Sequence, residues 1–248
     1  MYRNERFDTA AVTSVSVKLA WATLELLAAD VDQLQVLISG SDEDVEDMRA
    51  GIEKGVLTVE QPAYGLSTHI ASDRWLQVTL RIPRAWKGEI TGTTVAGMLS
   101  ARGLSGSDLR FSTVSGSLRA SQLTAMTLTL RTITGVLSAA EIAAEESVAA
   151  RTVSGEMLLS HLSAVRLKLT TVSGTLTADL DTAPAQTDVN TVSGDVSLTL
   201  PARAAAIRLR AVTGRLHTNG VAAGAEENAP VINAISVSGD LTVTSKES

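Results

Sequence analysis

The stretch RTVSGEMLLSHLSAVRLKLTTVSGTLTADL (151–180) decides the fold, because it contains two copies of the phrase TVSG whose glycines are 19 residues apart. Similar four-residue phrases that end in Gly recur at 94–97, 113–116, 132–135, 152–155, 171–174, 191–194, 211–214 and 236–239. The successive glycines are 19, 19, 20, 19, 20, 20 and 25 residues apart. A nearly constant period of about 20 residues predicts an architecture of stacked repeats.

Apolar residues around each phrase alternate as they do in β-strands. Leu, Met or Val stands two residues after each Gly, as at Leu118, Leu137 and Met157. This period of two predicts a strand with one buried face. We also expect the Val or Ile two residues before each Gly to point into the core: Val95, Val114, Ile133, Val153, Val172, Val192, Val212 and Val237.

The strand upstream of each phrase has the opposite phase. Its apolar residues fall five and seven positions before the Gly, as at Leu130 and Leu128. A change of phase within one chain requires a bend, which we place near the repeated Thr. A second corner is expected about six residues after the Gly, so that each repeat consists of two strands joined at a corner.

Stacking such two-sided units predicts an all-β, single-stranded β-solenoid in which each rung adds about 4.8 Å along the axis. We expect a single domain over 1–248, with an irregular N-terminal β cap at 1–87, about eight rungs over 88–244 and a polar tail at 245–248. The repeat glycines then form one column on the inner side of the bend, where a side chain would crowd the neighbouring rung. They are Gly97, Gly116, Gly135, Gly155, Gly174, Gly194, Gly214 and Gly239.

The composition excludes several classes of protein. The chain has 248 residues and a net charge of −6, which argues against a general nucleic-acid binder. It has no Cys and only three His, which excludes disulfide frameworks, thiol catalysis and most zinc sites. No apolar segment follows the charges at the start, and acidic residues interrupt the most apolar stretch, 19–38. We therefore expect no secretory signal and no membrane-spanning helix, which favours a cytoplasmic location.

Six cations recur at matching positions upstream of the phrases, and they are the candidate functional site. Three lie four residues before their Gly and three lie six residues before it, so both sets are expected to face outward on one sheet. They are Arg131, Arg151, Arg210, Arg110, Lys168 and Arg208. A positive band on an acidic protein suits an anionic partner such as a lipid headgroup, a teichoic-type polymer or an acidic protein. The alternative is a solvated face that keeps the sheet soluble.

Acidic residues and histidines are weaker candidates. Glu156 and Asp195 stand one residue after their glycines, two rungs or about 10 Å apart, with Thr175 between them and no implied cleft. Another acidic group lacks the spacing of a calcium-binding loop: Asp179, Asp181 and Asp188. The histidines share no column: His69, His161 and His217. We therefore expect no catalytic residue, no metal site and no cofactor.

The recurring TVSG-x-L phrase, the alternating N-terminal region and the Ile-Pro-Arg at 82–84 resemble the bacterial "putative adhesin" β-strand-repeat family, also called the toastrack domain. The resemblance covers roughly residues 12–244 and implies a right-handed β-solenoid or β-helix-like fold without established catalytic residues. It also implies an adhesin-like role at the cell envelope or surface, often linked to the envelope stress response.

We therefore expect a non-enzymatic binding or scaffold protein that offers its flat faces to a protein, an anionic envelope polymer or a lipid headgroup. One alternative is a solenoid enzyme that acts on polysaccharides, which requires several acidic or basic residues converging on one groove. Another is a self-assembling structural element, because the ends of a solenoid present unpaired strand edges.

Overall fold

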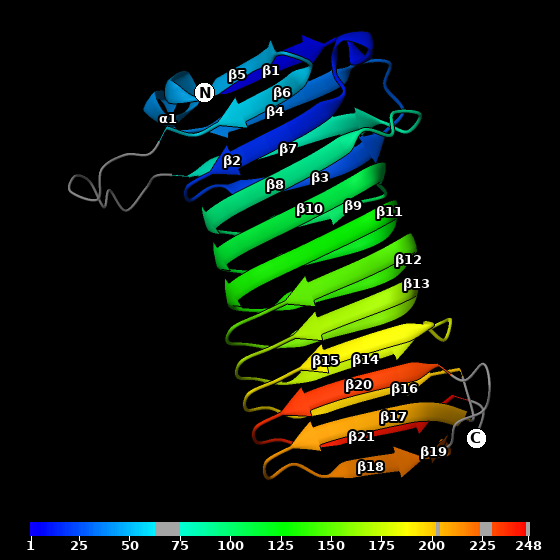
Figure 1. The fold of residues 1–248 in the computed structure, drawn as a ribbon. Helices are drawn as coiled ribbons and strands as arrows, with labels where there is room; N and C mark the ends of the chain where they lie inside the picture. The colour runs from blue at the N-terminus through cyan, green and yellow to red at the C-terminus, as the bar shows by residue number, and fades with distance from the viewer. Residues whose placement is uncertain (63–74, 202–203, 224–229, 247–248) are drawn as a thin grey trace.

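The computed structural model describes residues 1–62, 75–201, 204–223 and 230–246, and in these ranges the chain is wound into one long stack of strands (Figure 1). The helices in these ranges are short: the 3-10 helix η1 (Thr9–Ala11) and the α-helix α1 (Asp42–Asp47). The prediction of an all-β solenoid is confirmed. The right hand of the coil stays a prediction.

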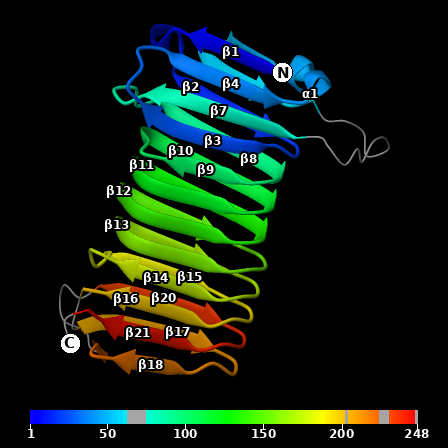
Figure 2. The same ribbon diagram turned by 180° about the vertical axis from the view of Figure 1, so that it is seen from behind.

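The middle of the stack consists of rungs that contribute strand segments to two sheets. The strands belong to one continuous sheet that coils into two layers, which we call the first sheet and the second sheet. The first sheet holds the segments that precede each repeat Gly, and the second sheet holds those that follow it (Figures 1 and 2). Three long strands turn a corner and belong to both sheets: β11 (Leu118–Thr134), β12 (Leu137–Arg151) and β13 (Met157–Thr170). The first sheet also contains β8 (Glu89–Ala96), β10 (Ser105–Ser115) and β15 (Gln186–Asn190). The second sheet also contains β9 (Leu99–Arg102), β14 (Leu176–Leu180) and β16 (Val196–Leu200).

Neighbouring rungs pair in parallel and in register, so equivalent residues lie on top of one another. Leu137 pairs with Leu118 on one side and with Met157 on the other. The serines of successive phrases also form isolated bridges, as between Ser154 and Ser173. The corner at each phrase is therefore aligned from rung to rung, like the strands that it joins.

The Val or Ile of the phrase lies on the surface, and the prediction that it lines the core is wrong. Ile133 is 46% exposed, whereas Thr132 beside it is 2% exposed. The alternation of the upstream strand continues from Leu128 and Leu130 through the Thr, so the residue after the Thr must point outward. The phase changes at Gly135, which has a φ of +120°. The bend therefore lies at the Gly and not, as predicted, near the Thr.

The Thr column occupies the core positions that Val was expected to fill. The hydroxyls of Thr113, Thr152 and Thr171 are buried and have no hydrogen-bond partner among the described residues. Thr132 differs, because its hydroxyl donates to the carbonyl oxygen of Thr134 at 3.3 Å. A buried hydroxyl without a partner costs about 1 to 3 kcal/mol. Thr at this position therefore stabilises the folded protein less than Val would.

The second corner lies six residues after the repeat Gly, as predicted. Five residues there have positive φ angles between 53° and 70°. They are Gly103, Gln122, Glu141, His161 and Gly220. This left-handed conformation turns the chain from the second sheet back to the first sheet.

The N-terminal region contains a regular rung as well as a cap. β2 (Ser14–Leu19) pairs in parallel with β8, and β3 (Thr23–Ala29) pairs in parallel with β9. Beyond this rung, the two sheets continue in parallel with β6 (Val56–Glu60) and β7 (Leu76–Pro83). Three antiparallel strands then close this end: β5 (Arg49–Glu53), β4 (Leu34–Gly40) and β1 (Tyr2–Phe7).

The last rung in the sequence is not the last rung of the stack. β20 (Val231–Ser236) lies between β15 and β17 (Ala204–Ala211), and β21 (Leu241–Ser245) lies between β16 and β18 (Leu216–Asn219) (Figure 1). The short β19 (Ala222–Ala223) pairs with β17. Residues 224–229, which stand between β19 and β20 in the sequence, lie outside the described residues. Stacking in strict sequence order, which the repeat suggested, therefore fails at this end.

Candidate functional site

Four of the six predicted cations lie on four consecutive strands of the first sheet. Arg110 is on β10, Arg131 on β11, Arg151 on β12 and Lys168 on β13, and all four are exposed. Arg131 and Arg151 pair directly in the parallel register. These four residues are called the basic stripe below.

Arg208 and Arg210 do not join the basic stripe. They lie on β17, and the strands β15 and β20 separate them from Lys168. The surface between includes the exposed Ile235 and also Asp188, whose carboxylate accepts hydrogen bonds from the Asn233 amide at 3.0 Å and the Gln186 amide at 2.8 Å. The insertion of β20 therefore divides the predicted band into a stripe of four cations and a separate pair.

Three cations of the stripe lack an ion-pair partner in the part of the chain that the structure describes. The guanidinium of Arg110 pairs with Asp108 on its own strand, but Arg131, Arg151 and Lys168 form no ion pair with any described residue. Like charges on adjacent strands repel one another. An anion bound between Arg131 and Arg151 would relieve this repulsion, so the stripe is suited to a negatively charged partner.

A shallow hollow lies on the first sheet within the stripe. It is lined by Arg110 and Arg131 together with Phe111 and the hydroxyl-bearing residues Thr91, Ser112 and Thr129. The hydroxyls of Ser112 and Thr93 lie 3.1 Å apart across two strands. Two guanidinium groups beside several hydroxyls can donate hydrogen bonds to the oxygens of a phosphate, sulfate or carboxylate.

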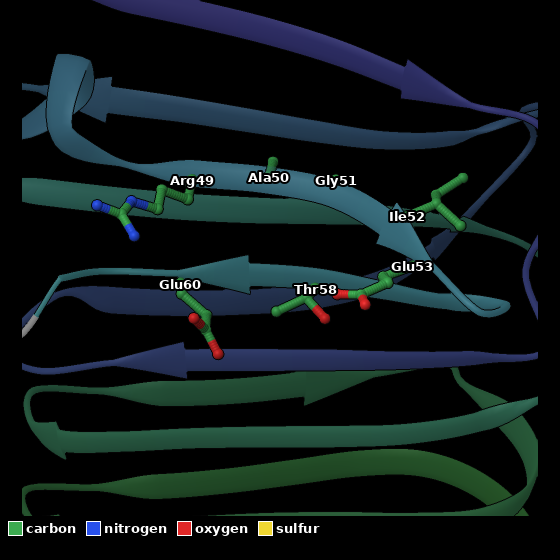
Figure 3. Close-up of a pocket in the computed structure, with 7 residues that line it drawn as sticks. All are labelled: Arg49, Ala50, Gly51, Ile52, Glu53, Thr58 and Glu60. Atoms are coloured by element: carbon green, nitrogen blue, oxygen red, sulfur yellow. The ribbon is translucent and has the colours of Figure 1, made fainter.

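Figure 3 shows another hollow, in the N-terminal cap between β5 and β6. It is lined by Arg49, Ala50, Gly51, Ile52, Glu53, Thr58 and Glu60. The Glu60 carboxylate is paired with Lys18 at 3.2 Å. The lining holds the carboxyl groups of Glu53 and Glu60 and the hydroxyl of Thr58, and it includes no Ser, Cys or His. No sequence motif marks it, because its residues belong to the irregular cap and not to the repeat.

Two of the three carboxylates that follow repeat glycines bind backbone N–H groups. Asp195 accepts a hydrogen bond from the backbone N–H of Asp240 at 3.0 Å, and Asp240 accepts one from the backbone N–H of Arg215 at 2.9 Å. The bond from Arg215 is the main cause that lowers the pKa of Asp240, and His217 adds to it. Glu156 lies two rungs from Asp195, as predicted, with the β14 rung between them. The pair therefore does not enclose a common cleft.

The predicted acidic group Asp179, Asp181 and Asp188 is not brought together. Asp188 lies on the first sheet, whereas Asp179 and Asp181 hold Lys246 near the C-terminus at 2.6 and 3.1 Å. Asp179 is the main cause that raises the pKa of Lys246, and Lys246 in turn lowers the pKa of Asp181. This arrangement fastens the end of the chain to the second sheet.

The histidines do not form a metal centre in the described part of the chain. His161 lies 3.2 Å from Asp181, and His217 lies 3.5 Å from Asp240. His69 lies outside the described residues. Across residues 1–62, 75–201, 204–223 and 230–246, no three His, Cys, Asp or Glu residues are grouped so that they could hold a metal ion.

A surface feature that the sequence reading missed is a line of aliphatic side chains along the corner at the phrases. Six of its eight members are at least 40% exposed. In the order of the stack they are Val95, Val114, Ile133, Val153, Val172, Val192, Val237 and Val212. We call this line the apolar ridge. Extending the alternation of the upstream strand through the Thr would have found it.

The family model described as Toastrack DUF4097 matches residues 12–244 of the chain. A solved structure of a "putative adhesin" from Bacteroides fragilis has a TM-score of 0.52 and 12% identity and covers 99% of this chain and 97% of its own. A "putative lipid binding protein" from Parabacteroides distasonis has a TM-score of 0.54 and 11% identity, covering 98% and 96%. A "putative adhesin" from the same organism has a TM-score of 0.53 and 11% identity, covering 99% and 97%.

No curated protein matches the chain. At 11–12% identity, the likeness to the solved structures concerns the fold and does not extend to the chemistry of a site. The described segments also include no helix with the length and apolarity needed to cross a bilayer.

Proposed function

We propose that this chain, which belongs to the Toastrack DUF4097 family, is a non-enzymatic binding protein that holds a negatively charged partner on the first sheet of its solenoid. The observation that carries the proposal is the basic stripe, in which Arg131, Arg151 and Lys168 are exposed on consecutive strands without an ion-pair partner among the described residues. Arg131 and Arg151 pair in register, and Lys168 lies on the next strand two residues before the partner of Arg151. Rungs about 4.8 Å apart thus present a rigid, staggered group of cations, which suits a partner with repeated negative charges.

The cell envelope is the setting that we propose for this binding. Two of the similar structures are of proteins described as putative adhesins, and one is of a protein described as a putative lipid binding protein. Anionic polymers and lipid headgroups both carry the repeated negative charge that the stripe fits. A scaffold role in envelope stress belongs to the same proposal and rests on the family resemblance.

An enzymatic role is not favoured by the arrangement of the acidic side chains. A polysaccharide-cleaving site needs two carboxyl groups on either side of one bond. Here Asp195 and Asp240 bind backbone N–H groups, and Asp179 and Asp181 bind Lys246. These carboxylates are occupied by the fold itself, which supports a binding function.

Self-assembly is the second candidate, because one end of the stack presents open strand edges. β19 pairs with β17 only at Ala204 and Ala205, β20 pairs with it over Ala206–Ala211, and β18 pairs with β21; no other described strand pairs with β17 or β18. Val212 at this end is 77% exposed. Light scattering over a range of protein concentrations tests this candidate, since end-to-end stacking predicts a mass that grows with concentration.

The basic stripe is tested by neutralising it. The triple variant Arg131→Gln, Arg151→Gln and Lys168→Gln should bind soluble polyphosphate more weakly than the unmodified chain. The binding free energy should become less favourable by about 2 kcal/mol, which raises the dissociation constant roughly thirtyfold, because each cation near an anionic surface contributes up to about 1 kcal/mol. Calorimetric titration at low salt measures the two affinities, and added salt should weaken binding of the unmodified chain.

A matched control removes the same charge from the second sheet. Arg81, Arg102 and Arg119 are exposed there, and their triple replacement by Gln changes the net charge equally. This control should keep the affinity within about a factor of three. Equal losses in the two variants, or no binding of polyphosphate by the unmodified chain, would refute a site on the first sheet.

A further inference from the structure

We propose that the apolar ridge and the basic stripe act together, and that they seat the molecule edge-on on an anionic lipid leaflet, with the ridge entering the headgroup region. This inference rests on the proposed function and names the class of partner. The ridge would supply apolar contact with the upper acyl chains, and the stripe would bind the headgroup phosphates.

The ridge is straight and rigid. Its residues occupy one position of the repeat, and the serine bridges that join Ser154, Ser173, Ser193 and Ser238 keep the phrases aligned. Eight levels at the usual strand spacing give a line of about 34 Å. Val and Ile are β-branched and nearly fixed in their rotamers, so the row loses little side-chain entropy on contact with a partner.

Arg131 and Arg151 lie directly beside the ridge, whereas Arg110 and Lys168 stand four residues before their ridge residues. Arg131 stands two residues before Ile133 on β11, and the two side chains point outward from this strand about 7 Å apart. Arg151 ends β12, two residues before Val153. A row of apolar side chains flanked by unpaired cations is the pattern by which peripheral proteins hold an anionic membrane surface. The charge beside the ridge therefore favours an anionic lipid surface over a neutral one.

The shape of the ridge also favours a lipid leaflet over a folded protein. The ridge projects from a corner, and on the second-sheet side of that corner Met98 and Val136 are 38% and 39% exposed. A folded partner would need a groove with the same pitch and length as this convex edge to bury it well. A fluid leaflet adapts to the edge without such a complementary groove.

The position of the ridge is tested with one fluorescent label. The chain contains no Cys, so Ile133→Cys creates a unique site for an environment-sensitive dye. On vesicles of phosphatidylcholine with phosphatidylglycerol, this label should shift its emission to the blue and brighten at least twofold. The same dye at Ser138→Cys, on the second sheet of the same rung, should not change. Equal responses at both positions, or none at Ile133, would overturn the proposal.

A set of substitutions separates this proposal from the one on which it rests. The triple variant Val114→Thr, Ile133→Thr and Val153→Thr keeps β-branched residues on the surface and removes apolar area. Its partition onto anionic vesicles should fall about tenfold, while its affinity for soluble polyphosphate stays unchanged. The neutralised stripe variant should lose affinity for both probes.

The remaining outcomes show which of the two proposals has failed. Unchanged vesicle binding by the ridge variant, with weakened binding by the stripe variant, would refute the ridge and leave the anionic site in place. Absence of binding to both probes by the unmodified chain would refute both proposals. A blue shift at Ile133→Cys that grows with protein concentration in the absence of vesicles would assign the ridge to contact between copies of the chain, which contradicts the lipid proposal.

Discussion

Replacing Gly155 with alanine should lower the free energy of unfolding by about 4 kcal/mol, because two independent costs coincide at this residue. The Cβ atom of an alanine would lie 2.0 Å from the carbonyl oxygen of Gly135 in the neighbouring rung, and the φ of Gly155 is +132°. Strained backbone in this region costs about 1 to 3 kcal/mol, and overpacking against atoms that cannot yield costs a similar amount. Urea unfolding followed by circular dichroism measures the change.

Gly51 offers the matched control for Gly155. It lies in β5, and a Cβ atom there would meet no atom within 4 Å. Gly51→Ala should therefore change the free energy of unfolding by less than about 0.5 kcal/mol. Similar small effects at both glycines would contradict the close contact between successive rungs at the phrase.

Replacing Phe111 with alanine should cost about 4 kcal/mol, the usual range for a fully buried aromatic side chain. Phe111 is 1% exposed and pairs in register with Gly92 on β8. A Cβ atom at Gly92 would lie 3.2 Å from the Phe111 ring and 3.1 Å from a methyl group of Leu26. The ring thus fills the space that the missing side chain of Gly92 leaves.

The pair is tested with a double-mutant cycle. Gly92→Ala alone should destabilise the protein by about 1 kcal/mol through crowding, and the same change should be neutral or stabilising once Phe111 is alanine. Thermal or urea unfolding of the four proteins gives a coupling free energy of at least about 1 kcal/mol. Additive effects would show that the two residues do not share one space.

The stacked architecture could be predicted from the phrases because few other architectures require a Gly at the same position of every repeat. At such a position an added Cβ atom would lie about 2.0 Å from a carbonyl oxygen of the neighbouring rung, so only Gly is tolerated. The interval at which Gly recurs in the sequence therefore gives the length of one rung. The sequence showed less clearly whether the Thr or the Val of the phrase is buried. Both residues are β-branched and nearly equal in shape, so residue type alone does not say which one is buried. Only the alternation of the upstream strand, extended through the Thr, distinguishes them.

The order of the rungs near the C-terminus could not be predicted from the sequence, for a different reason. Each rung presents the same kinds of residue at the same levels, so the rung of Gly239 fits between those of Gly194 and Gly214 as well as beyond them. Alternation alone predicted that the six cations face outward. Which cations are neighbours depends on the order of the rungs, and this is why Arg208 and Arg210 lie apart from the basic stripe.

The most direct test that the first-sheet side of this corner binds a negatively charged surface is hydrogen exchange of the unmodified chain, free and bound to anionic vesicles. Backbone amides at residues 114–117 and 133–136, on the corner beside the stripe, should exchange more slowly on the vesicles. Those at the opposite corner, around Gln122 and Glu141, should exchange at the same rate in both states. Slowing at the opposite corner, or no slowing at either, would contradict the assignment of this edge as the binding surface.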